Sequence, residues 1–208
     1  MSYDAQATRA RILEAATAEF SEYGVAGARV DRIAQRANAN KRAIYDYFGG
    51  KEKLFEVVLE AAQRRIADEV PMDPADPAAY VTRLFDYQSA HPELVRLLLW
   101  EGLSHGAEGA IPGADWRSEH YAAKTGTVRE AQLSGTVRDD QPPELLVFLL
   151  MAIANWNFAV PQLRRFLLGD DVAPERLRDA LASVAADLLR GGASGTRSAP
   201  EPEGRTPH

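Results

Sequence analysis

Two short helical patterns lie only three residues apart near the N-terminus, and this spacing constrains the fold more than any other feature of the 208-residue sequence. The first pattern repeats apolar residues on one helical face over residues 30–37. The second pairs Ile44 with Phe48, which lie one above the other on a helix. Between the patterns, Asn38 can take the left-handed conformation that ends a helix, and Asn40 can cap the helix that follows. The sequence therefore predicts a helix-turn-helix.

Positive charge gathers around this motif. Residues 29–53 hold seven basic and three acidic side chains, although the whole chain has a net charge of −6. The acidic excess lies entirely in residues 61–208. Because a local excess of positive charge attracts phosphate even on an acidic protein, we expect the second helix of the motif to meet double-stranded DNA.

Helical patterns continue along the rest of the chain, with no strand pattern and no internal repeat, so the predicted fold class is all-α. Gly24 is expected to end the first helix, and Gly49-Gly50 to end the second helix of the motif. The predicted helices cover residues 4–24, 30–37, 41–48, 51–70, 77–91, 92–103, 115–134 and 142–160, and a last one begins at Pro174. Pro161 should kink or break the chain after the apolar segment 142–160. We expect residues 191–208, which lack apolar periodicity, to be a disordered tail.

Composition removes several classes of function. The chain has no Cys, its four His are scattered, and no HExxH metal set occurs. A dinucleotide-binding fingerprint must follow a strand, and no strand is predicted before the Gly-rich segment around residue 108. We therefore predict no catalytic residues, no metal and no cofactor, and the protein is not expected to be an enzyme. No apolar run reaches about 18 residues and the N-terminus lacks the apolar core of a signal peptide, so we expect a soluble cytoplasmic protein without a membrane partner.

The N-terminal residues resemble a known family. From Thr8 the chain reads TRARILEAATAEF, then EYG, RVDRIAQRA, IYDYF and GKEKLF. Over roughly residues 8–60 this resembles the TetR family of transcriptional repressors. The resemblance implies a homodimeric, all-helical protein with a three-helix DNA-binding head, here residues 1–50. It also implies a larger C-terminal domain for ligand binding and dimerisation, here residues 51–190, in which residues 51–70 form a linking helix.

By position, the resemblance places base-reading residues at Lys41, Arg42 and Ala43 and phosphate contacts at Tyr45, Tyr47 and Lys51. Arg and Lys can bond the guanine edge in the major groove, whereas tyrosine hydroxyls and helix-start amides suit phosphate oxygens. Either tyrosine could instead pack on the head. The predicted DNA-contacting set is Arg29, Asn40, Lys41, Arg42, Ala43, Tyr45, Tyr47 and Lys51.

Three positions depart from the family pattern. Arg29 replaces the usual Thr or Ser cap, which removes a helix cap but offers a phosphate a stronger partner. Asn38 stands where Gly is usual, and Arg42 stands where a small residue or Pro is usual. None of these changes threatens the fold, but a long cation at Arg42 should change which bases are preferred.

Aromatic and polar residues of the larger domain are candidates for a ligand pocket between helices. The predicted ligand-binding set is Trp100, Glu101, His105, Trp116, His120, Tyr121, Asn155 and Trp156. Asn155 and Asn157 interrupt an otherwise apolar helix, where an unpaired amide costs free energy. Glu101 beside Trp100 and Asp115 beside Trp116 suggest a flat, aromatic or cationic ligand. The alternatives are that the aromatic residues are plain core and that the acids point to solvent.

Dimerisation is expected through the helices that begin at Pro142 and Pro174, packed with their counterparts as a four-helix bundle. The predicted interface residues are Leu145, Leu149, Leu177, Leu181, Val184 and Leu188. In the second helix the spacing of 4, 3 and 4 residues forms a lengthwise seam.

These features together predict a transcriptional regulator, most naturally a repressor, that binds operator DNA as a homodimer and is released by a small-molecule inducer. The alternative is a helical small-molecule-binding or scaffold protein without specific DNA binding.

Overall fold

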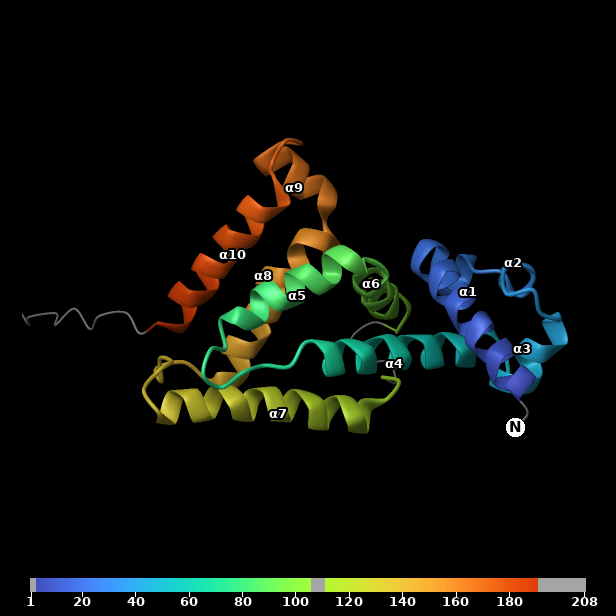
Figure 1. Ribbon diagram of the computed structural model, residues 1–208, viewed down its shortest axis with the longest axis horizontal. Helices are drawn as coiled ribbons and strands as arrows, with labels where there is room; N and C mark the ends of the chain where they lie inside the picture. The colour runs from blue at the N-terminus through green and yellow to red at the C-terminus, as the bar shows by residue number, and fades with distance from the viewer. Residues whose placement is uncertain (1–2, 106–110, 191–208) are drawn as a thin grey trace, which may run out of the picture.

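The computed structural model describes residues 3–105 and 111–190, and this part of the chain contains ten α-helices and no strand. The all-α fold class is thereby confirmed. In Figure 1 the three N-terminal helices form a head at one end of the molecule, and one long helix connects it to the remaining helices. The predicted tail 191–208 lies outside the described residues.

The head consists of α1 (Tyr3–Gly27), α2 (Val30–Arg36) and α3 (Lys41–Phe48). The turn between α2 and α3 forms as predicted: Asn38 has φ of 46°, and Asn40 Oδ1 accepts a hydrogen bond of 2.9 Å from Arg42 N. Gly24 has φ of 64° and interrupts the helical backbone near the end of α1. The helix-turn-helix predicted from the sequence is therefore present.

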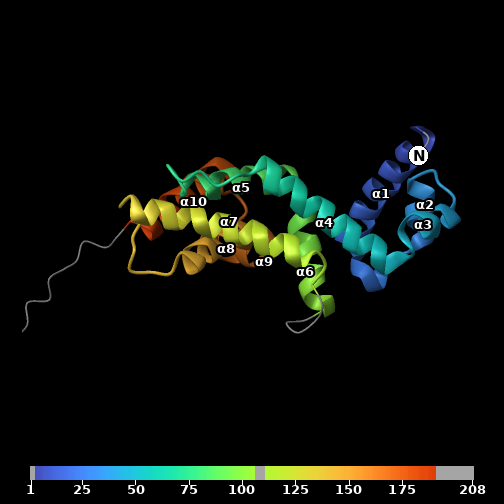
Figure 2. The ribbon, with the colours of Figure 1, turned by 90° about the horizontal axis from the view of Figure 1, so that it is seen from below.

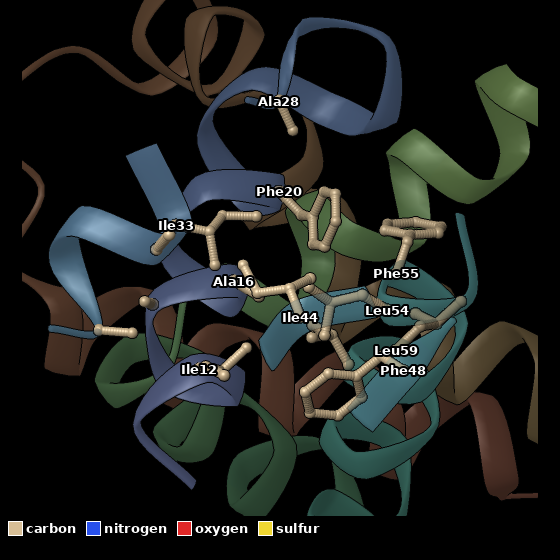
Figure 3. Packing of buried hydrophobic residues seen from close by; sticks show 14 of the residues in the cluster. Ile12, Ala16, Phe20, Ala28, Ile33, Ile44, Phe48, Leu54, Phe55 and Leu59 are labelled. Carbon is tan, nitrogen blue, oxygen red and sulfur yellow. The ribbon is translucent and has the colours of Figure 1, made fainter. Parts of the chain in front are cut away.

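A continuous apolar core holds the head together (Figure 3). It joins Ile12 and Phe20 of α1 to Ile44 of α3, and the Phe20 ring meets Phe55 edge-on at 5.3 Å between centroids. Each such buried side chain contributes about 1.5–3 kcal/mol relative to exposure. Phe55 belongs to α4 (Lys51–Glu69), so the packing of the head extends into the linking helix.

After α4 come α5 (Ala79–Ala90) and α6 (Glu93–His105). The start predicted for α5 at Pro77 is wrong by two residues. Tyr80 N and Val81 N bond to carbonyls three residues earlier, at Pro77 and Ala78, so the chain makes a tight turn before the α-helix begins. Asp76 still accepts a hydrogen bond from Ala79 N at 3.2 Å, as expected of a cap.

The remaining helices are α7 (Ala114–Leu133), α8 (Pro143–Ala159), α9 (Pro161–Leu168) and α10 (Pro174–Leu189). Of these, α7, α8 and α10 pack with α5 around a second core, and Figure 2, seen from below, shows α7 in front of α8. The break predicted at Pro161 is confirmed, since α8 and α9 meet at 87°. No single described helix is long and apolar enough to cross a membrane, and only this sharply bent pair has the length and composition together.

Candidate nucleic-acid interface and ligand cavity

One face of helix α3 packs on the core of the head, and the opposite face is exposed to solvent. Ile44 is fully buried and Phe48 nearly so, which fixes the helix on the core of the head (Figure 3). Asn40, Lys41, Arg42, Tyr45 and Tyr47 are exposed. A short rigid helix with polar side chains at its start and flanks is what entry into a major groove requires.

The cations at the start of α3 are paired with nearby carboxylates. Lys41 Nζ lies 2.9 Å from Asp31 Oδ1, and this hydrogen bond and charge raise the pKa of Lys41. Arg42 Nε lies 3.6 Å from Asp46 Oδ2, and the Arg42 side chain is 86% exposed. Exposed ion pairs of this kind are worth about 0–1 kcal/mol, so a phosphate or a base edge can replace either partner at little cost.

The other predicted contact residues flank this helix. Tyr45 and Tyr47 are both partly exposed, and the Tyr47 ring also meets Phe48 edge-on at 6.3 Å. Ala43 is half-buried and offers only its methyl group and backbone. Lys51 is half-buried at the start of α4, where the first helical amides are free to bind an anion.

Glu19 fixes the start of α2 and was not predicted from the sequence. Its buried carboxylate accepts hydrogen bonds of 2.8 Å from Arg29 N and from Arg32 Nε. Burial alone would raise the pKa of Glu19, but the hydrogen bonds from Arg32 and Arg29 lower it. The Arg29 side chain is exposed, so its backbone is anchored while its guanidinium can reach a phosphate.

Helix α6 joins the head to the second domain. Leu97 is buried in the core of the head, and Arg96 Nε donates to Ser21 O of α1 at 2.6 Å. Trp100 Nε1 donates to the same carbonyl at 3.2 Å, and its ring covers Gly24. Trp100, predicted as a pocket residue, therefore lies at the junction between the head and α6.

A cavity lies between α4, α5, α6, α7 and α8, and we call it the inner cavity. Four predicted ligand-binding residues line it: Trp116, His120, Tyr121 and Asn155. The Trp116 and His120 rings stack at 5.2 Å. The volume of the inner cavity is about 40 Å³, so it has room for a few water molecules or one small chemical group.

Three polar side chains of the inner cavity were missed by the sequence analysis. Lys124 is only 6% exposed, and its ammonium lies 4.4 Å from the centroid of the Tyr80 ring. Burial, with a smaller effect from Arg83, lowers the pKa of Lys124 to about 8. Gln88 Nε2 donates to Asn155 Oδ1 at 3.1 Å, whereas Gln88 Oε1 and Gln63 Nε2 are buried without a hydrogen-bond partner among the described residues.

The sequence did contain a signal for these three residues. Gln63 follows buried Leu59 by four residues, Gln88 follows Leu84 by four, and Lys124 precedes Val128 by four. Residues four apart share a helical face, so each polar side chain occupies a position that faces a core.

The other predicted ligand-binding residues lie elsewhere. Glu101 is buried and accepts a hydrogen bond of 2.7 Å from Arg117 Nη1, which ties α6 to α7. Trp156 is 60% exposed and lines a separate groove. His105 ends α6, and its side chain lies outside the described part. Neither Glu101 nor the exposed Asp115 lines the inner cavity, so the two carboxylates that suggested a cationic ligand are not in it.

An apolar surface covers one side of α8, α9 and α10. The groove between these helices has a volume of about 450 Å³ and is lined by Trp156, Leu181 and Val184 among others. All of α9 is exposed, including Phe166 at 89%. The predicted interface residues Leu145, Leu149, Leu177, Leu181, Val184 and Leu188 are all exposed or half-buried in the protomer. A large apolar surface of this kind is typical of a protein–protein interface.

Two families of sequences match the chain. Residues 12–58 match the family described as bacterial regulatory proteins of the tetR family, and residues 76–186 match the tetracycline-repressor-like C-terminal domain. The HTH-type transcriptional repressor SCO4008 of Streptomyces coelicolor is 49% identical over 89% of this chain and 97% of its own length. The HTH-type transcriptional repressor NicS of Pseudomonas putida is 35% identical over 65% of this chain and 68% of its own length.

Solved structures agree with this fold. The transcriptional regulator SCO4942 of Streptomyces coelicolor superimposes with a TM-score of 0.77 at 32% identity, covering 88% of this chain and 98% of its own. FadR of Bacillus subtilis in complex with stearoyl-CoA superimposes with a TM-score of 0.70 at 14% identity, covering 88% and 100%. With a helix-turn-helix head, an all-α second domain and matches along most of its length, the chain belongs to the TetR family of bacterial transcriptional regulators.

Proposed function

We propose that this protein is a ligand-responsive repressor, which binds operator DNA as a homodimer in the cytoplasm and is released when a small molecule binds its second domain. The observation that carries the proposal is the geometry of α3. The helix is fixed by buried Ile44 and Phe48 while its cations face outward on the head. The names of SCO4008 and NicS as repressors support the sign of the regulation.

The DNA contacts divide into two kinds. Lys41, Arg42 and Ala43 at the start of α3 are proposed to read base edges, and Tyr45, Tyr47 and Lys51 to bind phosphates. Arg29 and Asn40 complete the interface from the starts of α2 and α3. Lys41 and Arg42 must exchange Asp31 and Asp46 for the duplex when they bind it.

Homodimerisation is proposed through α8 and α10, whose outward apolar residues would form the four-helix bundle. A dimer places two α3 helices on one duplex, and they reach successive major grooves when they lie about 34–36 Å apart. The spacing of the two heads therefore determines the affinity for an operator.

Helices α4 and α6 are proposed to transmit ligand binding to the heads. Leu94 and Leu98 of α6 line the inner cavity, while Leu97 and Trp100 of the same helix pack on the head. A group that enters the inner cavity pushes on α6 directly, and α6 has hydrogen bonds to Ser21 in α1. A ligand that prefers another spacing of the heads weakens DNA binding by its differential affinity, typically about 1–3 kcal/mol.

A mobility-shift assay with the DNA upstream of the gene tests this function. Full-length protein should retard this duplex in the presence of excess random duplex, and Arg42→Ala should reduce this preference. If the protein binds small molecules yet shows no preference for any such duplex, the protein is a helical ligand-binding or scaffold protein and the repressor function is refuted.

A further inference from the structure

We propose that the inner cavity receives the anionic group of a small aromatic compound, such as an aromatic carboxylate, with Lys124 as its counter-charge. This proposal rests on the proposed function, because it names the chemical class of the inducer at the same site. It differs from the sequence-based expectation of a cationic ligand, which relied on Glu101 and Asp115.

Lys124 is the only charged side chain that lines the inner cavity among the described residues. Within this part of the chain it has no ion pair and no hydrogen bond, and its one specific contact is the face of the Tyr80 ring. A buried ammonium without a carboxylate is costly, and proteins normally pair such a charge. A ligand carboxylate would supply the missing partner.

The neighbouring amides suit the same group. Gln63 Nε2 is a buried donor without an acceptor among the described residues, and Gln63 lines the cavity together with Lys124. A carboxylate accepts several hydrogen bonds and can take one from each of these nitrogens. Gln88 Oε1 is a buried acceptor to which no group in residues 3–105 or 111–190 donates, so a ligand hydroxyl group could donate a hydrogen bond to it.

Aromatic side chains form the wall beside these polar groups. Trp116 and His120 stack, and Tyr121 lies next to His120 at 5.5 Å between ring centroids. Burial and the charge of Lys124 lower the pKa of His120, so this ring is neutral at pH 7 and does not compete for the anion. These rings line the part of the inner cavity in which the anionic group would lie beside Lys124.

An open groove adjoins the inner cavity. A groove of about 720 Å³ between α7 and α8 shares two lining residues, Tyr121 and Met151, with the inner cavity. The inner cavity alone, at about 40 Å³, holds little more than a carboxylate. The body of the ligand would therefore extend between Tyr121 and the flexible Met151 into this outer groove.

Three naphthalene derivatives of matched shape test the ligand class on the full-length protein: 2-naphthoate, 2-naphthamide and 2-naphthylmethylammonium. Thermal shift and fluorescence titration at pH 7 measure their binding. The naphthoate should bind at least about tenfold more tightly than the neutral amide, the equivalent of about 1.4 kcal/mol. In Lys124→Met this preference should disappear while amide binding remains.

A matched control separates the buried cation from charge in general. Arg65 lies on α4, the helix of Gln63, but it is exposed, is paired with Glu69 at 2.8 Å and lines neither the inner cavity nor the outer groove. Arg65→Met should keep the preference for naphthoate. The proposal is overturned if the ammonium compound binds best, if the preference survives Lys124→Met, or if none of the three compounds binds.

The pH dependence gives an independent readout. The other charged or titratable groups around Lys124 are Tyr80 and Arg83 of α5 and His120 and Tyr121 of α7, and the charge of Asp68 on α4 acts on His120. Burial raises the pKa of Tyr80 and lowers the pKa of His120, so neither of these two groups changes charge between pH 7.5 and 9.5. Because the pKa of Lys124 in the ligand-free protein is about 8, this side chain loses its charge as the pH rises from 7.5 to 9.5. The preference for naphthoate over the amide should therefore decline across this range. A preference that stays constant to pH 9.5 would contradict a role for the ammonium.

The same preparation, assayed on the upstream duplex, distinguishes two failures. Specific DNA binding without a naphthoate preference overturns the ligand class and leaves the repressor intact. A naphthoate preference that depends on Lys124, without specific DNA binding, supports the anion site and overturns the proposed repressor function.

Discussion

Arg42 and Lys51 hold different positions relative to a duplex, and their substitutions should differ in kind. Arg42 is exposed at the start of α3, while Lys51 is half-buried at the start of α4. Arg42→Ala should weaken operator binding by about 1–3 kcal/mol and relax base preference, because a base-edge contact is lost. Lys51→Ala should weaken all DNA binding and reduce its salt dependence by about one counterion. Titrations of operator and random duplex at several salt concentrations measure both effects.

An equal loss on operator and random duplex for both variants would refute the assignment of Arg42 to base reading. Ser104, which is exposed on α6, provides a control position: Ser104→Ala should bind both duplexes as the wild type does.

Lys124 should be a destabilising residue in the ligand-free protein. Burial lowers its pKa from 10.5 to about 8, and each unit corresponds to about 1.4 kcal/mol. Lys124→Met should therefore raise the free energy of unfolding at pH 7 by about 1–3 kcal/mol. This gain is smaller than the pKa shift of Lys124 alone implies, because the substitution also removes the favourable contact between the ammonium and the Tyr80 ring. Urea denaturation measures the change.

The pH dependence of this gain follows from proton linkage. Between pH 8 and 10.5 the unfolded chain binds a proton at Lys124 that the folded protein does not, so wild-type stability rises with pH in this window. The advantage of Lys124→Met should shrink across the same window. A gain that is absent at pH 7, or one that grows from pH 8 to 10.5, would show that the ammonium is not desolvated in the folded protein.

At the scale of single residues, the turn was predictable and the buried polar partners were not. Asn38 and Asn40 act through their own backbone and the next few amides, so their roles can be inferred from local sequence. Glu19 is held by groups ten and thirteen residues away, and Lys124 meets Tyr80 from another helix. Such partners depend on tertiary packing, which local patterns do not specify.

At the scale of elements, the junction between α1 and α6 depends on one glycine. Gly24 has φ of 64° and ψ of −178°, and a Cβ atom there would lie 2.6 Å from Trp100 Cδ2. Gly24→Ala should lower the free energy of unfolding by about 2–4 kcal/mol, because backbone strain adds to a clash with a rigid ring. Operator binding should also weaken, since α6 is displaced from the head.

Gly102 in α6 offers the matched control, since a Cβ there would meet nothing within 4 Å. Gly102→Ala should be neutral or stabilise by up to about 1 kcal/mol through helix propensity. Thermal and urea unfolding compare the two variants. Equal stabilities would mean that Trp100 moves away freely and that the junction is not tightly packed.

Element boundaries show where local rules are ambiguous. Pro161 was correctly expected to end α8, but the same residue also starts α9, which the sequence analysis did not separate from its surroundings. Proline is favoured in the first turn of a helix and excluded from its interior, so one residue can serve both ends. All residues of α9 are exposed in the described part of the protomer, so no buried apolar face marked this segment as a separate helix.

At the scale of the whole molecule, the predicted helices occur in the predicted order. The predicted ligand-binding residues, however, do not form one site. The eight predicted ligand-binding residues separate among the inner cavity, the head junction, the Glu101–Arg117 pair, the apolar groove and a side chain outside the described residues. All eight residues lie on helices whose composition suggests a pocket, but where each side chain points depends on the angles at which five helices cross. The sequence predicts helices and their apolar faces more readily than it predicts these angles.

The proposed dimer makes the most demanding prediction at this scale. Val184 is 53% exposed on α10 and lines the apolar groove, so Val184→Asp should leave the protomer folded. In a two-fold symmetric interface the substitution occurs twice, and each carboxylate would be desolvated without a partner. We expect dissociation to monomers at micromolar concentration in sedimentation velocity, with unchanged helical circular dichroism. Leu181→Asp should behave alike, although Leu181 also packs on the second core.

Ser183 is exposed and lies away from the seam formed by Leu181 and Val184, so Ser183→Asp should remain dimeric. Because each monomer carries one α3, Val184→Asp should lose operator affinity far more than affinity for random duplex, since two half-sites can no longer be held at about 34–36 Å. If Val184→Asp sediments as a dimer and still binds the operator, the assignment of the dimer interface to α8 and α10 is wrong. The spacing of the heads would then depend on another surface, and the route from the inner cavity to DNA would have to run through it.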